Sequence, residues 1–581
     1  MIKTLLVGIN AKFIHSNLAI RSLKEYAKQH YRIPIQISEY TINQRVEWIL
    51  SEIYKQSPDI IGFSCYIWNY EMIKHLVCEL KKVLPNTVIF LGGPEVSYSA
   101  KQVLLDTPAD AVIMGEGEQV CAQLIDAMIH HHPLEQIHGI TYRTKQQIIE
   151  NPPANLLPMA DIPFVYQDMT DFKHRIVYYE SSRGCPFHCQ YCLSCNDNQV
   201  RFRPLEQVFE HLNFFLTHHV RQVKFVDRTF NCKKSYAMAI WRYLQAHDNG
   251  YTNFHFEIAA ELLDEEMLSF FPSVRKGLFQ FEIGVQSTNP LTLKHIQRNT
   301  QIEKLRTIIS RLQNGNIHLH LDLIIGLPYE DYQRFSQSFN DVYALAPDQL
   351  QVGFLKLLKG SGLYEKQTQY GIVCSDYAPY EVLYTSHLSY LDILKLKMIE
   401  EMVEIYYNSN RFIQTIRYLV SLFPSPFAMF EALATFYEQQ QYHCCSHSNV
   451  EYYSILYKFF QTLSPTDTTS FQWLAKFDLY SHEKAKKLPE WLTVSNHEHL
   501  REEIYQFYHN KQQIETYLPE YAHLDSKQIY RQAHIEQFPF HPITGEQTDT
   551  IILFNYQNCD LLGNATYFVL DSLIERSDVD E

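Results

Sequence analysis

Short apolar runs alternate with amphipathic segments along the first 130 residues. Period-two or continuous apolar runs predict strands, and spacings of three and four predict helices. Strands are expected at residues 3–9, 33–39, 59–64, 87–91 and 111–114, and helices at 17–29 and 45–56 and after Trp68. This alternation predicts a doubly wound parallel α/β domain over residues 1–135, with a ligand beyond the carboxyl ends of its strands.

A second alternating stretch covers residues 176–363. Strands are expected at 176–180, 222–226, 254–259, 278–285, 317–325 and 350–357, with helical segments between them. Six such units predict a partial (βα)6 barrel of the TIM type, with its chemistry at the carboxyl ends of the strands. Residues 136–175 interrupt the alternation and are predicted to be a linker with a small strand pair.

The pattern changes again after residue 364. Tyr, Phe, Leu and Ile recur at helical spacing through 386–407, 412–423 and 427–441. A mainly helical domain is therefore predicted for residues 364–581.

Composition narrows the class of protein. The 581 residues carry 50 Lys and Arg against 65 Asp and Glu, a net charge of −15, so a nucleic-acid partner is not expected. The 12 Cys residues are scattered except for one cluster, unlike a secreted disulfide framework. With no apparent signal peptide or membrane span, a cytoplasmic location is expected.

The cysteine cluster carries the strongest chemical signal. Cys185, Cys189 and Cys192 form Cys-x3-Cys-x2-Cys just after the first predicted barrel strand. Three thiolates on one loop can bind three irons of a cubane cluster and leave the fourth iron open to a ligand. A zinc site remains an alternative, with Cys195 or His188 as fourth ligand. A ferredoxin-type carrier is another, although ferredoxin cysteines are spaced more closely.

This spacing, with Tyr191 before the last cysteine, resembles the signature of the radical S-adenosylmethionine (SAM) superfamily. The resemblance implies that Cys185, Cys189 and Cys192 hold a 4Fe-4S cluster whose open iron chelates SAM. One electron then yields methionine and a 5'-deoxyadenosyl radical. The resemblance also implies that Tyr191 packs beside the adenine.

Four further polar residues are candidate SAM ligands. Glu282 and Gln286 lie in Glu-Ile-Gly-Val-Gln-Ser, which resembles the strand end that meets the SAM ribose and methionine. Asp227, at the mouth of the second strand, is a candidate for the SAM ammonium or for a helix N-cap. Asp322 is polar within an apolar strand and either faces the barrel mouth or satisfies a buried network.

The N-terminal domain has glycine-rich strand ends but no Gly-x-Gly-x-x-Gly after its first strand. Gly92 and Gly93 end the fourth strand, and Glu116 and Gly117 follow the fifth, where a large ligand could approach the backbone. A Rossmann-like domain before a cluster barrel resembles the cobalamin-binding radical SAM proteins, which implies cobalamin as a further cofactor. The later segments resemble an uncharacterised branch with a C-terminal domain of unknown function.

The resemblance implies an enzyme that uses SAM and cobalamin for methylation or another radical modification, such as cyclisation. A radical SAM methylthiotransferase is an alternative, with Cys65, Cys78 and Cys121 as additional ligands. A non-enzymatic cobalamin or redox sensor is another. The expected partners are a small-molecule, peptide or tetrapyrrole substrate and a one-electron donor such as flavodoxin or ferredoxin.

Overall fold

The computed structural model describes residues 2–194, 199–313, 316–485, 487–493, 500–559, 563–570 and 573. Its internal contacts divide the chain into two compact units. One comprises residues 1–335 and 354–390, and the other comprises 336–353 and 391–581.

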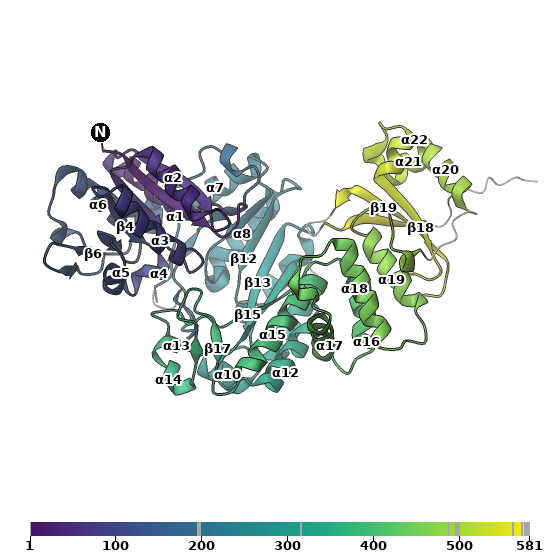
Figure 1. The fold of residues 1–581 in the computed structure, drawn as a ribbon. Helices are drawn as coiled ribbons and strands as arrows, with labels where there is room; N and C mark the ends of the chain where they lie inside the picture. Colours follow the sequence, from purple (N-terminus) through teal and green to yellow (C-terminus); the bar gives the residue numbers. More distant parts are fainter. Residues whose placement is uncertain are drawn as a thin grey trace, which may run out of the picture. The chain divides into compact units, whose positions relative to one another are not determined.

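The N-terminal domain is built on a seven-stranded sheet of order β2-β1-β3-β4-β5-β6-β7 (Figure 1). Its five parallel strands, all predicted from the sequence, are β1 (Thr4–Asn10), β2 (Ile35–Thr41), β3 (Ile60–Ser64), β4 (Val88–Gly92) and β5 (Ala111–Ile113). The edge strands β6 (Ile140–Arg143) and β7 (Ile148–Glu150) run antiparallel. The strand pair expected in a linker therefore belongs to this sheet, because Ile140 and Tyr142 are buried in its core.

Helices cover both faces of this sheet. The helices α2 (Val46–Gln56) and α3 (Tyr70–Val83) enclose one apolar core, together with α4 (Pro94–Ser97) and α5 (Ala100–Asp106). On the other face, α1 (Leu18–Tyr31) and α6 (Glu118–His130) enclose a second core. Burial on both faces explains why β1 is apolar along nearly its whole length.

The predicted partial barrel is confirmed as a six-stranded sheet of order β8-β11-β12-β13-β14-β15. Its strands are β8 (Val177–Tyr179), β11 (Gln222–Phe225), β12 (Asn253–Glu257), β13 (Phe279–Gln286), β14 (His318–Ile325) and β15 (Gln349–Phe354). Outward-facing aromatic residues pack under the helices; Phe256, for example, stacks within 4.5 Å of Phe225 and 4.3 Å of Phe230, measured between ring centroids. The flanking helices include α7 (Leu205–Thr217), α8 (Lys234–Ala246) and α11 (Ile302–Gln313).

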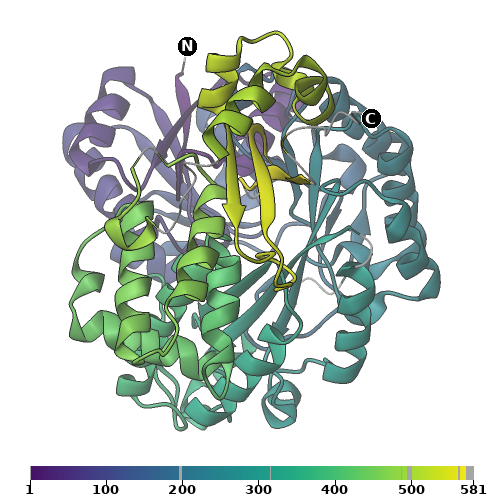
Figure 2. The same ribbon diagram turned by 90° about the vertical axis from the view of Figure 1, so that its right-hand side faces the viewer.

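The C-terminal part of the second unit, from residue 391, starts with helices at the predicted positions. These are α15 (Tyr390–Val403), α16 (Ile413–Ser421) and α17 (Pro426–Gln439), and they are followed by α18 (Asn449–Thr462), α19 (Thr469–Tyr480), α20 (Arg501–His509), α21 (Lys511–Tyr517) and α22 (Ser526–Gln532). A three-stranded antiparallel sheet, which the sequence pattern did not predict, closes this unit. Its strands, yellow in Figure 2, are β18 (Ala533–Phe538), β19 (Thr550–Cys559) and β20 (Ala565–Leu570).

In the part of the chain that the structure describes, no single helix is long and apolar enough to cross a membrane. Only α16 and α17 taken together, bent by 104° at their junction, meet that criterion of length and composition.

Candidate functional site

The cysteine loop leaves the carboxyl end of β8 and is closed at its base by a short ladder. In this ladder β9 (Ser182–Arg183) pairs antiparallel with β10 (Arg201–Phe202), and Arg183 lies opposite Arg201. The segment between the two strands contains Cys185, Cys189 and Cys192. The three cysteines therefore lie at the strand end where a barrel of this kind places its chemistry.

Each thiol has its own polar neighbour. The Sγ of Cys185 lies 3.4 Å from the hydroxyl of Thr229, and that of Cys189 lies 3.8 Å from a guanidinium nitrogen of Arg298. The Sγ of Cys192 accepts a hydrogen bond of 3.4 Å from the amide of Ser194. Donors and a positive charge beside sulfur stabilise thiolates and tune iron–sulfur clusters.

Three thiols that form no disulfide, on one loop and next to a cation, have the chemistry that a 4Fe-4S cluster needs. Within the described residues, however, no three His, Cys, Asp or Glu side chains already converge on a metal-binding arrangement. Cys195, the proposed bystander or fourth ligand, lies outside the described residues. The assignment of Cys185, Cys189 and Cys192 as cluster ligands stays a prediction.

The start of the cysteine loop is held from within the barrel by Asp227. Its carboxylate accepts hydrogen bonds from the amide of Ser181 (3.0 Å), the hydroxyl of Ser181 (2.7 Å) and the hydroxyl of Ser182 (2.5 Å). Asp227 is 1% exposed, and burial raises its pKa to about 6 although these hydrogen bonds lower it. With both oxygens engaged, the geometry favours a supporting role for Asp227 over the predicted contact with SAM.

The middle of the loop is held by the segment that follows the barrel. The carbonyl of Gln190 accepts a hydrogen bond of 2.8 Å from the amide of Leu363, and its side-chain oxygen accepts one of 2.8 Å from Lys366. A Cβ at Gly362 would lie 2.3 Å from the side-chain oxygen of Gln190, so any larger residue there would displace the Gln190 side chain from this position. The neighbours of Cys189 and Tyr191 are thus fixed from a distant part of the sequence.

Three buried polar atoms in this part of the barrel lack partners among the described residues. They are Oε1 of Gln286 at the end of β13, Oδ1 of Asp322 within β14, and Nε of Arg298 in the segment before α11. Buried polar atoms are normally satisfied, so these groups fit a polar ligand such as SAM. Burial, with the like charges of Glu282 and Glu257 nearby, raises the pKa of Asp322 well above its ordinary value, which favours its protonated form.

Arg298 was missed by sequence reasoning. Besides its contact with Cys189, it donates a hydrogen bond to the carbonyl of Gly284. Tyr191 lies near the same guanidinium and Cys189, and burial raises its pKa. Arg298 follows Glu-Ile-Gly-Val-Gln-Ser by eleven positions, and nothing in the local sequence ties it to the cysteine loop.

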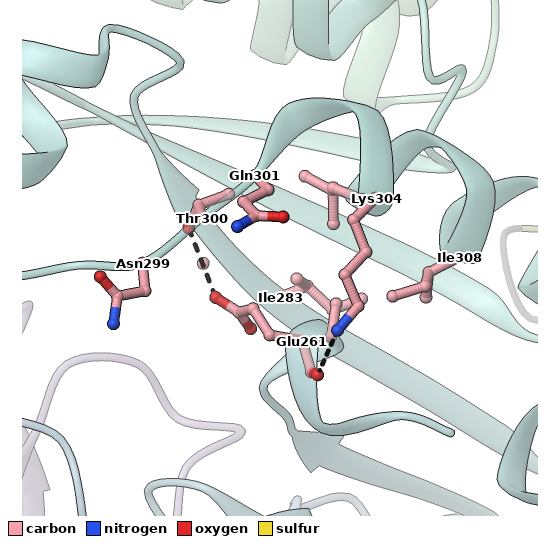
Figure 3. A pocket seen from close by; sticks show the side chains of 10 residues that line it. Glu261, Ile283, Asn299, Thr300, Gln301, Lys304 and Ile308 are labelled. Carbon is pink, nitrogen blue, oxygen red and sulfur yellow. Dashed lines mark hydrogen bonds between the residues drawn. The ribbon is translucent and has the colours of Figure 1, made fainter. Parts of the chain in front are cut away.

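A small cavity lies beside Gly284 on the helix side of β13 (Figure 3). In it, the hydroxyl of Thr300 donates to a carboxylate oxygen of Glu261 (3.4 Å), and Lys304 donates to the backbone carbonyl of Glu261 (3.0 Å). Its volume of about 110 Å³ is below the roughly 300 Å³ at which pockets begin to enclose a whole small molecule. The cavity could therefore accept only part of a ligand.

Glu282 faces the inside of the barrel and is already paired. Its Oε2 lies 3.0 Å from Nζ of Lys224 and 3.0 Å from Nε2 of His255. Burial alone would raise the pKa of Glu282, but His255 and Lys224 outweigh it and hold the pKa at about 2. Its predicted contact with SAM stays a prediction. No local sequence pattern indicates that Lys224 of β11 and His255 of β12 are its partners.

The candidate cobalamin residues of the N-terminal domain occupy tight strand ends. Gly93 has φ +112°, and a Cβ there would lie 2.5 Å from the carbonyl of Cys65. A Cβ at Gly117 would lie 3.0 Å from Leu23, whereas Gly92 has ordinary space. Glu116 is bound by Arg201 of the cysteine-loop ladder rather than free in a cleft. Their predicted roles in cobalamin binding stay predictions.

The same edge of the N-terminal sheet exposes apolar side chains. Phe13 and Ile14, after β1, are 65% and 45% exposed, and Trp68, after β3, is 43% exposed and stacked on Tyr66. Exposed apolar groups at a ligand-binding edge fit a large macrocycle such as that of cobalamin. His15 is not free there, because its Nδ1 lies 2.6 Å from the hydroxyl of Tyr178 in the barrel.

A Rossmann-like domain whose strand ends meet a three-cysteine loop on a partial barrel is the domain arrangement of the cobalamin-binding radical SAM proteins, and this chain has that arrangement. The family model described as B12 binding domain matches residues 4–125. The model described as Radical SAM superfamily matches residues 179–342. A third family model, described as Protein of unknown function (DUF4080), matches residues 368–554. The cofactors of the chain are accordingly a 4Fe-4S cluster, SAM and cobalamin.

Two curated relatives share the first two modules. The anaerobic magnesium-protoporphyrin IX monomethyl ester cyclase of Synechocystis is 27% identical over 50% of this chain and 60% of its own length. The cobalamin-dependent radical SAM methyltransferase TokK of Streptomyces tokunonensis is 25% identical over 64% and 58%. The chain thus spans less than two thirds of either relative.

A solved structure shares the fold. The cobalamin-dependent SAM radical enzyme OxsB, with aqua-cobalamin and SAM bound, superposes with a TM-score of 0.58 over 80% of this chain and 79% of its own. The two sequences are 16% identical.

Proposed function

We propose that the protein is a radical SAM enzyme that uses cobalamin to methylate an unactivated carbon of its substrate. The observation that carries the proposal is the cysteine loop at the end of β8, whose base is joined by Arg183 and Glu118 to the strand ends of the B12-binding domain. That contact brings the two cofactor-binding modules together. The methyltransferase relative supports the choice of reaction.

The chemistry that the bound cluster and SAM supply is one-electron cleavage to methionine and a 5'-deoxyadenosyl radical, which takes a hydrogen atom from the substrate. The chain contributes Cys185, Cys189 and Cys192 as iron ligands. Gln286, Arg298 and Asp322 offer the polar contacts for SAM. A flavodoxin- or ferredoxin-like protein supplies the electron.

Cyclisation or rearrangement without methyl transfer is the second candidate, favoured by the cyclase among the relatives. A methylthiotransferase is disfavoured, because Cys65 and Cys121 are buried in the two separate cores on opposite faces of the N-terminal sheet. Burial raises the pKa of both thiols, which opposes the thiolate form that iron requires.

The test uses SAM with a trideuterated methyl group, anaerobic reconstituted protein and a metabolite extract, with and without hydroxocobalamin. Methyl transfer predicts 5'-deoxyadenosine together with a cobalamin-dependent product that carries the labelled methyl. Formation of 5'-deoxyadenosine together with a new product that lacks the label would contradict methylation. It would favour cyclisation or rearrangement without methyl transfer. If no 5'-deoxyadenosine formed under any condition, the enzymatic proposal would be wrong and a sensor would be favoured.

A further inference from the structure

Two carboxylates of the N-terminal domain bind the base of the cysteine loop. They belong to the turn Gly115–Glu118, which leaves β5 and begins α6. The two terminal guanidinium nitrogens of Arg183 donate hydrogen bonds to the two carboxylate oxygens of Glu118, at 2.6 Å and 3.2 Å. Arg201 likewise donates hydrogen bonds to both carboxylate oxygens of Glu116, and the distance from its Nη1 to Oε2 is 3.3 Å. Paired contacts of this kind fix orientation as well as distance.

The arrangement places two like charges side by side. Arg183 and Arg201 are directly opposite each other in the β9/β10 ladder, where like charges destabilise pairing. Both side chains are mostly buried, at 17% and 12% exposed. Glu116 bridges them, because it also lies 3.5 Å from Arg183. The ladder that closes the cysteine loop is thus neutralised by side chains from another domain.

We propose that Glu118 and Glu116 are positioning residues that clamp both ends of the cysteine loop, so that cluster assembly and cobalamin binding are energetically coupled. The turn that carries them lies at the carboxyl end of β5, the edge at which a sheet of this type binds its ligand. Arg183 is two residues before Cys185. A ligand that orders this turn therefore also orders the first cluster cysteine.

Two further contacts restrict the clamp to one arrangement. The hydroxyl of Ser22 in α1 donates a hydrogen bond of 3.0 Å to Oε1 of Glu118, which is 4% exposed. Glu180 lies 2.8 Å from Arg183 on the barrel side. Loss of the Glu118 carboxylate would remove the paired contacts of Arg183 and leave it with the carboxylates of Glu180 at 2.8 Å and Glu116 at 3.5 Å, so the orientation of this buried arginine would be less well fixed.

The chain offers a matched control at Glu39. Its carboxylate is as buried as that of Glu118, at 6% side-chain exposure in each case, and it binds two arginines, Arg21 and Arg175, as Glu116 binds Arg183 and Arg201. Arg175 precedes β8, so this ion pair also links the N-terminal domain to the barrel. It does not touch the ladder of the cysteine loop.

The experiment measures the affinity of the full-length protein for hydroxocobalamin before and after cluster reconstitution, together with iron per chain. The wild type is expected to bind about ten-fold more tightly with the cluster present, within the usual range of coupling between sites. In Glu118→Gln the ratio of the two hydroxocobalamin affinities, with and without the cluster, should fall close to one. The iron content per chain after reconstitution should also fall. Glu39→Gln should keep both values.

Arg183→Lys keeps the charge but loses the paired geometry, so a partial loss of coupling is expected. This variant carries the test if Glu118→Gln does not fold. A wild-type ratio of one, an unchanged ratio in the folded clamp variants, or an equal loss in Glu39→Gln would overturn the proposal. No turnover is measured, so the outcome is independent of whether the proposed methylation is correct.

Discussion

Single residues in the barrel show how partners on neighbouring strands set the charge state of a side chain. Glu282, Lys224 and His255 come from three adjacent strands, and their mutual contacts of 3.0 Å keep the Glu282 carboxylate ionised. Asp322, on the next strand, has no such partner for its Oδ1 among the described residues, so burial drives it toward the neutral form. The pKa values of two carboxyl groups in one barrel are therefore shifted in opposite directions.

Glu282→Gln should weaken the barrel most at neutral pH. The folded pKa of Glu282, about 2, is below its ordinary value of 4.5, so its contribution is present above pH 4.5 and is lost as pH falls toward 2. A shift of this size corresponds to roughly 3 kcal/mol. Amide hydrogen exchange of β12 and β13 should be faster in the variant at pH 7, and the difference should shrink below pH 4.5.

Asn253→Ala provides a comparison at a polar, inward-facing position without a carboxylate, and its effect should not depend on pH between 3 and 7 in this way. A difference between wild type and Glu282→Gln that stayed constant down to pH 3 would contradict the assigned ion pair.

At the scale of elements, most of the fold could be predicted from apolar periodicity. The five parallel strands of the first sheet and the six barrel strands have strong local signals, because each is buried on at least one face. The antiparallel sheet β18–β20 was missed, since its strands pair only with one another at the end of a helix-rich region. Likewise, the sequence of β6 and β7 does not indicate which sheet these strands join.

The site could be predicted only where its residues are close in sequence. The spacing of Cys185, Cys189 and Cys192 is local and marks the loop. The groups that hold that loop are distant in sequence: Glu118, Asp227, Arg298 and Lys366 each reach it from a different element. Single-sequence patterns contain no information on such contacts, so Arg298 and the clamp were missed.

The tight junction between β3 and β4 gives a prediction at the element scale. Gly93→Ala should destabilise the N-terminal domain by more than about 2 kcal/mol, because it combines a positive φ with a Cβ placed 2.5 Å from a backbone oxygen. Gly250→Ala is the control: its φ is +73°, but nothing lies within 4 Å of the new Cβ. Thermal unfolding should show the larger decrease for Gly93→Ala, and equal decreases would contradict the close approach.

At the scale of the whole molecule, the chain joins three modules whose boundaries do not coincide with its compact units. The B12-binding and radical SAM matches lie almost entirely in the first unit. The DUF4080 match begins at residue 368, inside that unit, and continues through the second. The residues just before the match, Leu363 and Lys366, hold Gln190 of the cysteine loop. Support of the cluster loop therefore extends to the start of the third module.

The central claim is that Cys185, Cys189 and Cys192 start the reaction by holding the cluster that cleaves SAM. The most direct measurement is 5'-deoxyadenosine formation and iron content after anaerobic reconstitution and reduction of the full-length protein. Wild type and Cys78→Ala, a half-buried cysteine in α3, should bind iron and form 5'-deoxyadenosine. Each of Cys185→Ala, Cys189→Ala and Cys192→Ala should lose both. Full activity in any of these three, or loss of both properties in Cys195→Ala alone, would contradict the account.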